Sequence, residues 1–241
     1  MVMNVKSGSK PCGYGCRLRL AVPAFLLVLS LVVPVWAGER YFSPDQFDAV
    51  ALLAPPPAPG FAEQTADLAS ARAVFKAATP AEQARAEKDA SLSLFNFAPA
   101  IGSFFQPGRL PKMEALFEIV KTNTSEAINT PKDHWKRVRP YEPDPTLLLG
   151  KPEKSFAYPS GHATRGTVQS LLLAELFPEK REAILAFGRD IGWDRVLIGK
   201  HFPTDIHAGR VLGQAIVREL KANSAFQRDF AEVKAEVQVA R

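Results

Sequence analysis

Tyr158-Pro159-Ser160-Gly161-His162 opens the stretch that sets the fold, because it starts a long helix and gathers polar groups in that helix's first turn. Pro159 restricts the approach of the chain, and Ser160 is a preferred helix-capping residue. Gly161 has no Cβ, so the amides at this helix N-terminus can come close to an anion. An ordinary helix cap with an incidental histidine fits these five residues equally well. The stretch predicts a helix over 160–176 and a candidate anion site at its start.

A basic cluster lies upstream of this stretch. Lys132 and Arg139 are seven residues apart in the pattern K-x6-R-P, which is about two helical turns, so one helix face could present both cations. Pro140 restricts Arg139, however, and favours an end to the helix there. Lys136 and Arg137 compete for the same role on spacing alone. We expect these two to form a solvated face instead.

A second basic cluster with a histidine and an acid lies downstream, in the pattern R-x5-H-x3-D. Arg195 supplies a cation whose planar fork suits two adjacent anion oxygens. His201 and Asp205 are four residues apart, and Pro203 between them favours a turn that leads into a helix. Either arrangement lets Asp205 accept the Nδ1 proton of His201 and leave Nε2 free. A histidine and aspartate pair at this spacing is also found in purely structural roles.

Taken together, the three clusters resemble the three-part signature of the type-2 phosphatidic acid phosphatase and vanadium haloperoxidase superfamily. Within it, the chain most resembles the bacterial non-specific class A acid phosphatases. The run FDAVALLAPPPAPG over 47–60 is similar to their amino-terminal region, and residues 208–213 resemble the segment after their third cluster. One position departs from the family, which usually has Ser where this chain has Asp194. An acid there could orient Arg195, or could weaken anion binding.

The resemblance implies a metal-independent phosphomonoesterase with broad specificity, an acidic optimum and no cofactor. His201 would attack phosphorus and form a phosphohistidine, Asp205 would orient His201, and His162 would protonate the leaving oxygen and later activate water. Five groups would hold the equatorial oxygens: Lys132, Arg139, Arg195, the Ser160 hydroxyl and the Gly161 amide. The alternatives are a vanadium-dependent haloperoxidase, in which His201 ligates vanadate, and a catalytically retired periplasmic phosphate-binding protein.

Residues 1–37 have the pattern of a cleaved secretory signal peptide: a basic start, an apolar run over 20–35 and small residues before the predicted cleavage site. Of the 30 Lys and Arg in the chain, four lie in this segment. After cleavage, 26 basic residues would therefore be balanced by 25 Asp and Glu. The basic charge therefore gives no support to nucleic-acid binding. Cys12 and Cys16 leave with the segment. We expect a periplasmic or secreted product without a stable membrane anchor.

The remaining residues, 38–241, are expected to form one all-α domain, a helical bundle of the kind found in this superfamily. The pattern predicts helices over 43–54, 64–78, 111–129, 160–176, 178–193, 203–222 and 225–239. A further helix begins at Pro80 after a Thr79-Pro80-Ala81-Glu82 capping pattern and could continue over 89–97. Phosphate monoesters are the expected small-molecule partners, nucleic acid is not expected, and a homo-oligomer stays open.

Five other residues near the clusters have plausible roles at the site. His134 and His207 are interpreted as incidental, since no metal-binding pattern surrounds them. Phe156, Tyr158 and Trp193 could line a pocket for the leaving group. Core packing is the expectation we adopt for all three aromatic residues.

Overall fold

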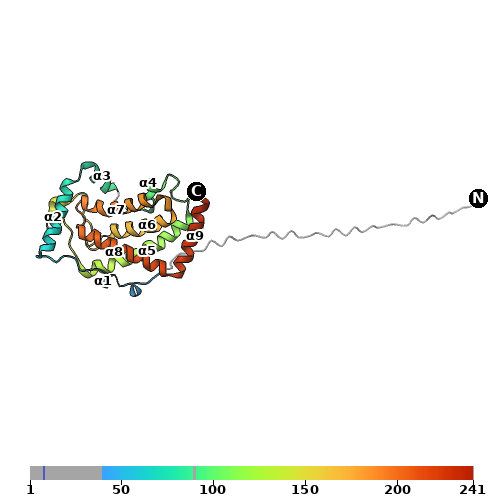
Figure 1. Ribbon diagram of the computed structural model, residues 1–241, viewed down its shortest axis with the longest axis horizontal. Coiled ribbons are helices and arrows are strands. Elements are labelled where there is room, and N and C mark those ends of the chain that lie inside the picture. The colour runs from blue at the N-terminus through green and yellow to red at the C-terminus, as the bar shows by residue number, and fades with distance from the viewer. Residues whose placement is uncertain (1–7, 9–39, 89–90, 241) are drawn as a thin grey trace, which may run out of the picture. The chain divides into compact units, whose positions relative to one another are not determined.

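The computed structural model describes residues 40–88 and 91–240, together with Gly8, and across these residues it contains helices and no strands (Figure 1). The α-helices are α1 Ala49–Leu52, α2 Ala62–Ala77, α3 Pro80–Lys88, α4 Ala98–Ile101, α5 Pro111–Trp135, α6 Gly161–Leu176, α7 Arg181–Leu197, α8 Pro203–Ala222 and α9 Ser224–Ala240. Short 3₁₀ helices cover Pro44–Gln46, Leu94–Phe97, Pro145–Leu147 and Pro178–Lys180. The all-α prediction is confirmed. The predicted signal peptide lies outside the described residues, apart from Gly8.

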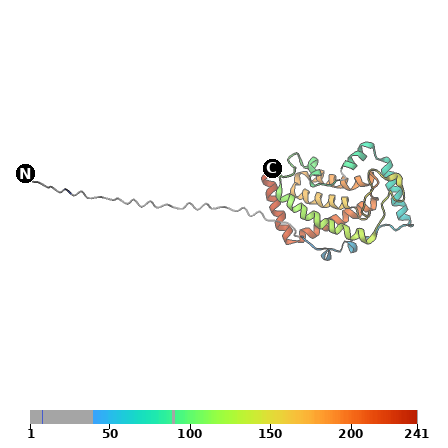
Figure 2. The ribbon, with the colours of Figure 1, turned by 180° about the vertical axis from the view of Figure 1, so that it is seen from behind.

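Helix α6 occupies the middle of the bundle, with α7 along one side and α8 and α5 along the other (Figures 1 and 2). Small residues allow this close packing. A Cβ added to Gly188 of α7 would lie 2.4 Å from the Ser170 Cβ of α6. A Cβ added to Gly209 of α8 would lie 2.6 Å from the Ser160 carbonyl oxygen. Both contacts are too short for a side chain, so these glycines let α7 and α8 pack closely against α6.

Helix α5 is longer than predicted and changes where the upstream cluster lies. It continues through Pro131 and ends at Trp135, where Lys136 adopts a left-handed conformation with φ 49°. Ile128 and Pro131 are both buried, so the apolar face of the helix persists beyond the predicted end. Of the two arrangements left open by the sequence, the structure has the one in which the helix ends before Arg139, so no single helix face carries both cations. Lys132 is on the last turn of α5, whereas Arg139 is in the loop after it.

Other helix boundaries agree with the predictions or differ for visible reasons. The helix predicted over 43–54 is interrupted, because the Asp48 carboxylate accepts hydrogen bonds from the Val50 and Ala51 amides and starts α1 there. The Thr79 cap of α3 is confirmed by its mutual hydrogen bonds with Glu82. Helix α7 extends beyond 193 to Leu197, so the downstream cluster begins inside a helix.

Several predicted elements match closely. The helix predicted over 203–222 is α8, and the last predicted helix is α9. Residues 54–58, between α1 and α2, have no regular secondary structure. Among the described residues, no helix combines the length and the apolar character needed to span a membrane.

Candidate active site

Hydrogen bonds to the backbone join the three clusters at one end of α6. The Ser160 amide donates to the Asp205 carbonyl oxygen at 3.0 Å, which ties the start of α6 to the start of α8. The Ala157 amide donates to the Arg137 carbonyl oxygen at 2.8 Å, which ties the loop after α5 to the segment before α6. Arg139 donates from Nη1 to the Lys200 carbonyl oxygen at 2.8 Å. The three clusters therefore meet near the N-terminus of α6, although Arg195 lines a different cavity.

A cavity of about 100 Å³ lies where these segments meet. Cations and histidines form much of its wall, and Gly161 forms another part. Its lining residues are Ile128, Asn129, Lys132, Arg139, Glu153, Ser155, Gly161, His162, Arg165 and His201. The cavity is small and strongly basic, with the N-terminus of α6 at its wall. Such a site favours a small anion.

His201 is buried and held at both ring nitrogens. Its Nδ1 lies 3.1 Å from Asp205 Oδ2, and its Nε2 lies 3.1 Å from Arg139 Nη1. A guanidinium only donates, so Nε2 is the acceptor and the proton is on Nδ1. Burial, followed by the charges of Arg139 and Lys132, lowers the pKa of His201 well below its ordinary value. His201 is thus a neutral imidazole whose unprotonated nitrogen faces the cations of the cavity.

Asp205 is completely buried and accepts from three groups. Besides His201, the Phe202 amide donates to Oδ2 at 2.9 Å, and Arg137 Nη1 donates to Oδ1 at 2.6 Å. Arg137 also binds Asp67 of α2 at 2.7 Å through Nη2. Burial raises the pKa of the Asp205 carboxyl, and the Arg137 guanidinium opposes that change. Arg137 therefore compensates the charge of Asp205 behind His201, and Asp67 holds Arg137 from its other side.

The prediction that Arg137 belongs to a solvated face was wrong. Its side chain is 5% exposed, it stacks over the Phe202 ring at 4.0 Å, and it contacts two carboxylates. Lys136 is exposed as predicted. Spacing alone did not separate the two neighbours, because the left-handed turn at Lys136 directs the next residue inward. Asp67, one of two acids in the Ala-rich helix α2, was the one sequence signal for a buried partner.

Lys132 and Arg139 are both buried beside His201. Lys132 Nζ donates to the Phe156 carbonyl oxygen, and Arg139 donates from Nε to the Ser155 carbonyl oxygen at 2.9 Å. Burial, followed by the charge of Arg139, lowers the pKa of Lys132 to about 7. Burial also lowers the pKa of Arg139. The two cations lie close enough to oppose each other's charge, which an anion in the cavity would relieve.

Arg195 is buried at the end of α7 and pairs with Glu153, not with its neighbour Asp194. Two of its nitrogens, Nε and Nη1, are buried without a hydrogen-bond partner among the described residues. Asp194 instead forms an ion pair with Arg85 of α3 at 2.7 Å. The Asp194 carboxylate therefore has an ion-pair partner outside the site, although its charge still acts to raise the pKa of Arg195. Glu153, which lies outside the three sequence clusters, is a carboxylate that lines the cavity.

The first turn of α6 combines a structural cap with groups that face the cavity. Ser160 is buried, and its Oγ accepts a hydrogen bond from the Ala163 amide at 3.3 Å. Gly161 lines the cavity, and a Cβ there would lie 3.6 Å from Arg165 Nη1. His162 is half-buried and lines both this cavity and a neighbouring one. It therefore lies where an anion would meet the rest of a larger ligand.

The structure agrees with the predictions for some of the histidines and aromatic residues that we placed outside the site, and differs for others. His134 and His207 are exposed, in agreement with an incidental role. Tyr158 is buried as expected, and its hydroxyl donates to the Ala54 carbonyl oxygen. Core packing was the wrong expectation for Trp193 and Phe156, which are 38% and 37% exposed. None of the three aromatic side chains lines the basic cavity.

Within residues 40–88 and 91–240, no group of three or more His, Cys, Asp or Glu side chains is arranged to hold a metal ion. The charged residues of the site are mainly cations. The arrangement can bind a tetrahedral oxyanion and present a neutral histidine to it.

Comparison with known proteins agrees with this geometry. The model of the PAP2 superfamily matches residues 115–227, which contain all three clusters. An acid phosphatase of Zymomonas mobilis is 30% identical over 203 residues, covering 80% of this chain and 77% of that protein. A non-specific acid phosphatase of Providencia stuartii is 31% identical over 202 residues, covering 78% of this chain and 80% of that protein.

A solved structure shares the fold. The transmembrane PAP2-type phosphatidylglycerolphosphate phosphatase of Bacillus subtilis superposes with a TM-score of 0.50 at 24% identity, covering 72% of this chain and 89% of that one. The sequence identity to the two acid phosphatases extends along most of the chain, so it supports a more specific assignment than the shared fold does. The chain belongs to the PAP2 superfamily and, within it, to the bacterial non-specific acid phosphatases, so it is a phosphatase.

Proposed function

We propose that the protein is an exported, metal-independent acid phosphatase that hydrolyses phosphate monoesters of broad structure through a phosphohistidine. The observation that carries this proposal is the state of His201. Its Nδ1 is bound to Asp205, its Nε2 accepts a hydrogen bond from Arg139, and both contacts are buried at a small basic cavity. A neutral imidazole with a directed lone pair is what nucleophilic attack on phosphorus requires.

In the first step, the phosphoryl group enters the cavity and takes Arg139 as a hydrogen-bond donor, which releases the lone pair of His201 Nε2. That lone pair forms the new N–P bond while the P–O bond to the leaving group breaks. His162, in its protonated form, gives its proton to the departing oxygen. The product alcohol leaves, and the phosphoryl group stays on His201.

In the second step, water attacks phosphorus. His162, now neutral, takes a proton from that water, the N–P bond breaks, and its electron pair returns to Nε2. Inorganic phosphate then leaves. Asp205 keeps the Nδ1 proton in place throughout and stabilises the positive charge that forms on the ring. The Arg137 and Asp67 pair holds Asp205 in the orientation this requires.

The charge of the transition state can be met by protein groups alone. Lys132, Arg139 and Arg195 are fixed cations, and the Gly161 amide and Ser160 hydroxyl lie at the N-terminus of α6. Preorganised donors of this kind stabilise equatorial oxygens without a cation from solution. Metal independence is therefore part of the proposal, and chelation tests it.

An acidic optimum is expected from two pKa changes in opposite roles. The lowered pKa of His201 keeps the nucleophile unprotonated in mild acid. The pKa of Lys132, about 7, keeps that side chain charged in mild acid but not at alkaline pH. Both groups are thus in their working forms on the acid side of neutrality.

The experiment is rapid quench of the enzyme with an isotopically labelled aryl phosphate, in EDTA. We expect acid-labile phosphate on the wild type and none on His201→Ala. Inhibition by vanadate without peroxidase activity would separate this function from that of a haloperoxidase. If EDTA abolishes turnover and zinc or magnesium restores it, or if His201→Ala is labelled like the wild type, the mechanism is wrong.

Export is the part of the proposal that depends on the sequence alone. The basic start, apolar run and small residues of 1–37 support it. Amino-terminal sequencing of the product from the periplasm or medium should begin at or near Gly38. A membrane-bound product that retains residues 1–37 would overturn it.

A further inference from the structure

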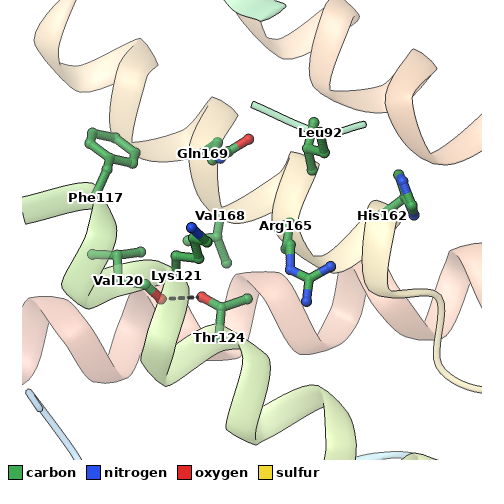
Figure 3. A pocket seen from close by; sticks show the side chains of 9 residues that line it. All are labelled: Leu92, Phe117, Val120, Lys121, Thr124, His162, Arg165, Val168 and Gln169. Atoms are coloured by element: carbon green, nitrogen blue, oxygen red, sulfur yellow. Dashed lines mark hydrogen bonds between the residues drawn. The ribbon is translucent and has the colours of Figure 1, made fainter. Parts of the chain in front are cut away.

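A second cavity, of about 280 Å³, adjoins the basic one between α5 and α6 (Figure 3). The two cavities share His162 and Arg165 in their walls. In Figure 3 the Arg165 side chain lies between His162 and the Val168 region of α6. A molecule whose phosphoryl group occupies the first cavity would thus extend into the second one past the proposed proton donor.

Beyond this junction the lining of the second cavity is more apolar than polar, and its polar residues include Lys121 and Thr124 of α5. Its apolar wall consists of Leu92, Phe117, Val120 and Val168. Gln169 also lines it, and Gln169 Oε1 is buried without a hydrogen-bond partner among the described residues. A buried amide oxygen of this kind is costly unless a ligand or water meets it. The lining therefore suits a flat or branched apolar body that carries a polar substituent.

Arg165 adds a specific charge requirement. Its Nη1 lies over Gly161, and among the described residues its side chain donates one hydrogen bond, a long one of 3.3 Å from Nη2 to Ser125 Oγ. No described carboxylate forms an ion pair with it. Most of the hydrogen-bond donors of the Arg165 guanidinium lack a partner within the described part of the chain, and its planar fork can donate to two anion oxygens at once. The guanidinium therefore offers its remaining donors to a ligand at the junction.

We infer that this second cavity is the leaving-group subsite, and that it favours phosphate monoesters whose leaving group combines an apolar body with a second negative charge near the ester oxygen. The inference rests on the proposed function, since it places the leaving group beside His162. Arg165 would bind the second charge, and the Leu92 and Phe117 wall would cover the apolar body. Arg165 is then a specificity residue of the same reaction, distinct from the cations that hold the phosphoryl group.

The experiment compares two aryl phosphates of the same shape, 3-carboxyphenyl phosphate and its neutral analogue 3-carbamoylphenyl phosphate. We expect the wild type to favour the carboxylate by roughly 10- to 100-fold in kcat/KM, the scale of a hydrogen bond to a charged group. Arg165→Gln should lose that preference, and Arg165→Lys should keep part of it. Arg210→Gln, which removes a half-buried arginine that lines neither cavity, should leave it unchanged.

Inhibition by inorganic phosphate separates the subsite from the phosphoryl site. Phosphate lacks a leaving group but meets Arg165 at the wall that the two cavities share, so Arg165→Gln should weaken phosphate inhibition by less than it lowers the carboxylate preference. An equal loss of phosphate binding and carboxylate preference would show that Arg165 holds the phosphoryl group and would overturn the inference. Equal rates of the wild type on both esters would overturn the inference of a charged leaving-group subsite but leave the proposed phosphatase function intact. No hydrolysis of any ester would overturn the proposed function as well.

The apolar wall is tested at Leu92, which is half-buried and outside the helices. Leu92→Asn should raise KM for the aryl phosphates by roughly 3- to 10-fold, since it removes apolar contact area. The same variant should hydrolyse glycerol 2-phosphate at the wild-type rate, because that leaving group is too small and polar to use the wall. Equal effects on both substrate types would contradict the subsite.

Discussion

The two histidines of the site stand in contrasting surroundings. His201 is buried, and behind it Asp205, Arg137 and Asp67 form a chain of hydrogen bonds with alternating charge. His162 is half-buried at the junction of two cavities, one basic and one more apolar than polar. In the proposed mechanism, the first region holds one geometry for phosphorus, which every substrate shares. The second leaves room for leaving groups that differ, which is the physical basis we propose for broad specificity.

The contrast is tested most strongly by His201→Ala. This variant should lose roughly 10⁴- to 10⁶-fold in kcat on every substrate, because no other group can form the N–P bond. Steady-state rates on an alkyl and a nitrophenyl phosphate measure it. Asp205→Asn should lose much activity as well but retain some phosphoenzyme. Comparable turnover of His201→Ala and the wild type would show that His201 is not the nucleophile, and the contrast between the two histidines would no longer hold.

His162→Ala should behave differently, because it removes only the proton donor. On an alkyl phosphate the loss should be roughly 10²- to 10⁴-fold, the scale of general acid catalysis, and it should shrink on nitrophenyl phosphate. A good leaving group needs no proton in the transition state. A plot of log kcat against leaving-group pKa measures the change. His134→Ala, at an exposed histidine, is the control. The same slope for His162→Ala and the wild type would contradict the assignment.

The buried charge chain behind His201 predicts a large effect on stability. Arg137→Met leaves Asp67 and Asp205 buried without their shared cation, so it should lower the free energy of unfolding by about 3–5 kcal/mol. Denaturant unfolding measures this. Lys136→Met, at the exposed neighbour, is the matched control and should change stability by less than about 0.5 kcal/mol. Similar changes in the free energy of unfolding for the two variants would show that the buried charges behind His201 do not stabilise the fold.

Phosphate binding should depend on the ionisation of Lys132. Because its pKa is lowered to about 7, the side chain is charged in acid and loses its proton as the pH rises through that value. Inhibition by phosphate should weaken by roughly tenfold more in the wild type than in Lys132→Arg between about pH 6.5 and 8.5. The ionisation of phosphate itself affects both proteins equally. Parallel pH profiles would contradict the assignment.

The lowered pKa of Lys132 affects the stability of the fold in the opposite direction, so that stability increases as the pH rises. Between about pH 7 and the ordinary lysine value of 10.5, the unfolded chain binds a proton that the folded protein does not. This group's contribution to the free energy of unfolding should therefore increase with pH in that window. Comparing unfolding of the wild type and Lys132→Met across the window measures it.

The smallest effect is expected at Glu153, which places a carboxylate among the cations. Burial alone would raise its pKa, but Arg195 and then Arg139 outweigh burial and lower it, so Glu153 is ionised in mild acid. Glu153→Gln should tighten phosphate inhibition by roughly two- to fivefold, because Arg195 loses a competing anion. Glu182→Gln, at an exposed glutamate of α7, is the control. Weaker phosphate binding in Glu153→Gln would show that Glu153 orients Arg195 instead.

Much of this molecule is determined by local sequence. The cap at Ser160, the Thr79 and Glu82 capping pattern and the proline that opens α8 each depend on groups within four residues, so their positions were predictable. The three clusters predicted the residues that line or adjoin one cavity, because their chemistry is specific even before their geometry is known. Helix ends were less predictable, since burial of Ile128 and Pro131 extends α5 beyond its expected end.

The sequence by itself determined an all-α chain with three clusters of candidate site residues, among them the histidine and aspartate pair. Only the tertiary structure decided that Arg137 turns inward to Asp67, 70 residues away, that Glu153 rather than Asp194 pairs with Arg195, and that Arg165 separates two cavities. The physical reason is range. Helix caps and motif spacing depend on near neighbours, whereas the partner of a buried charge depends on which distant segment the packing brings beside it.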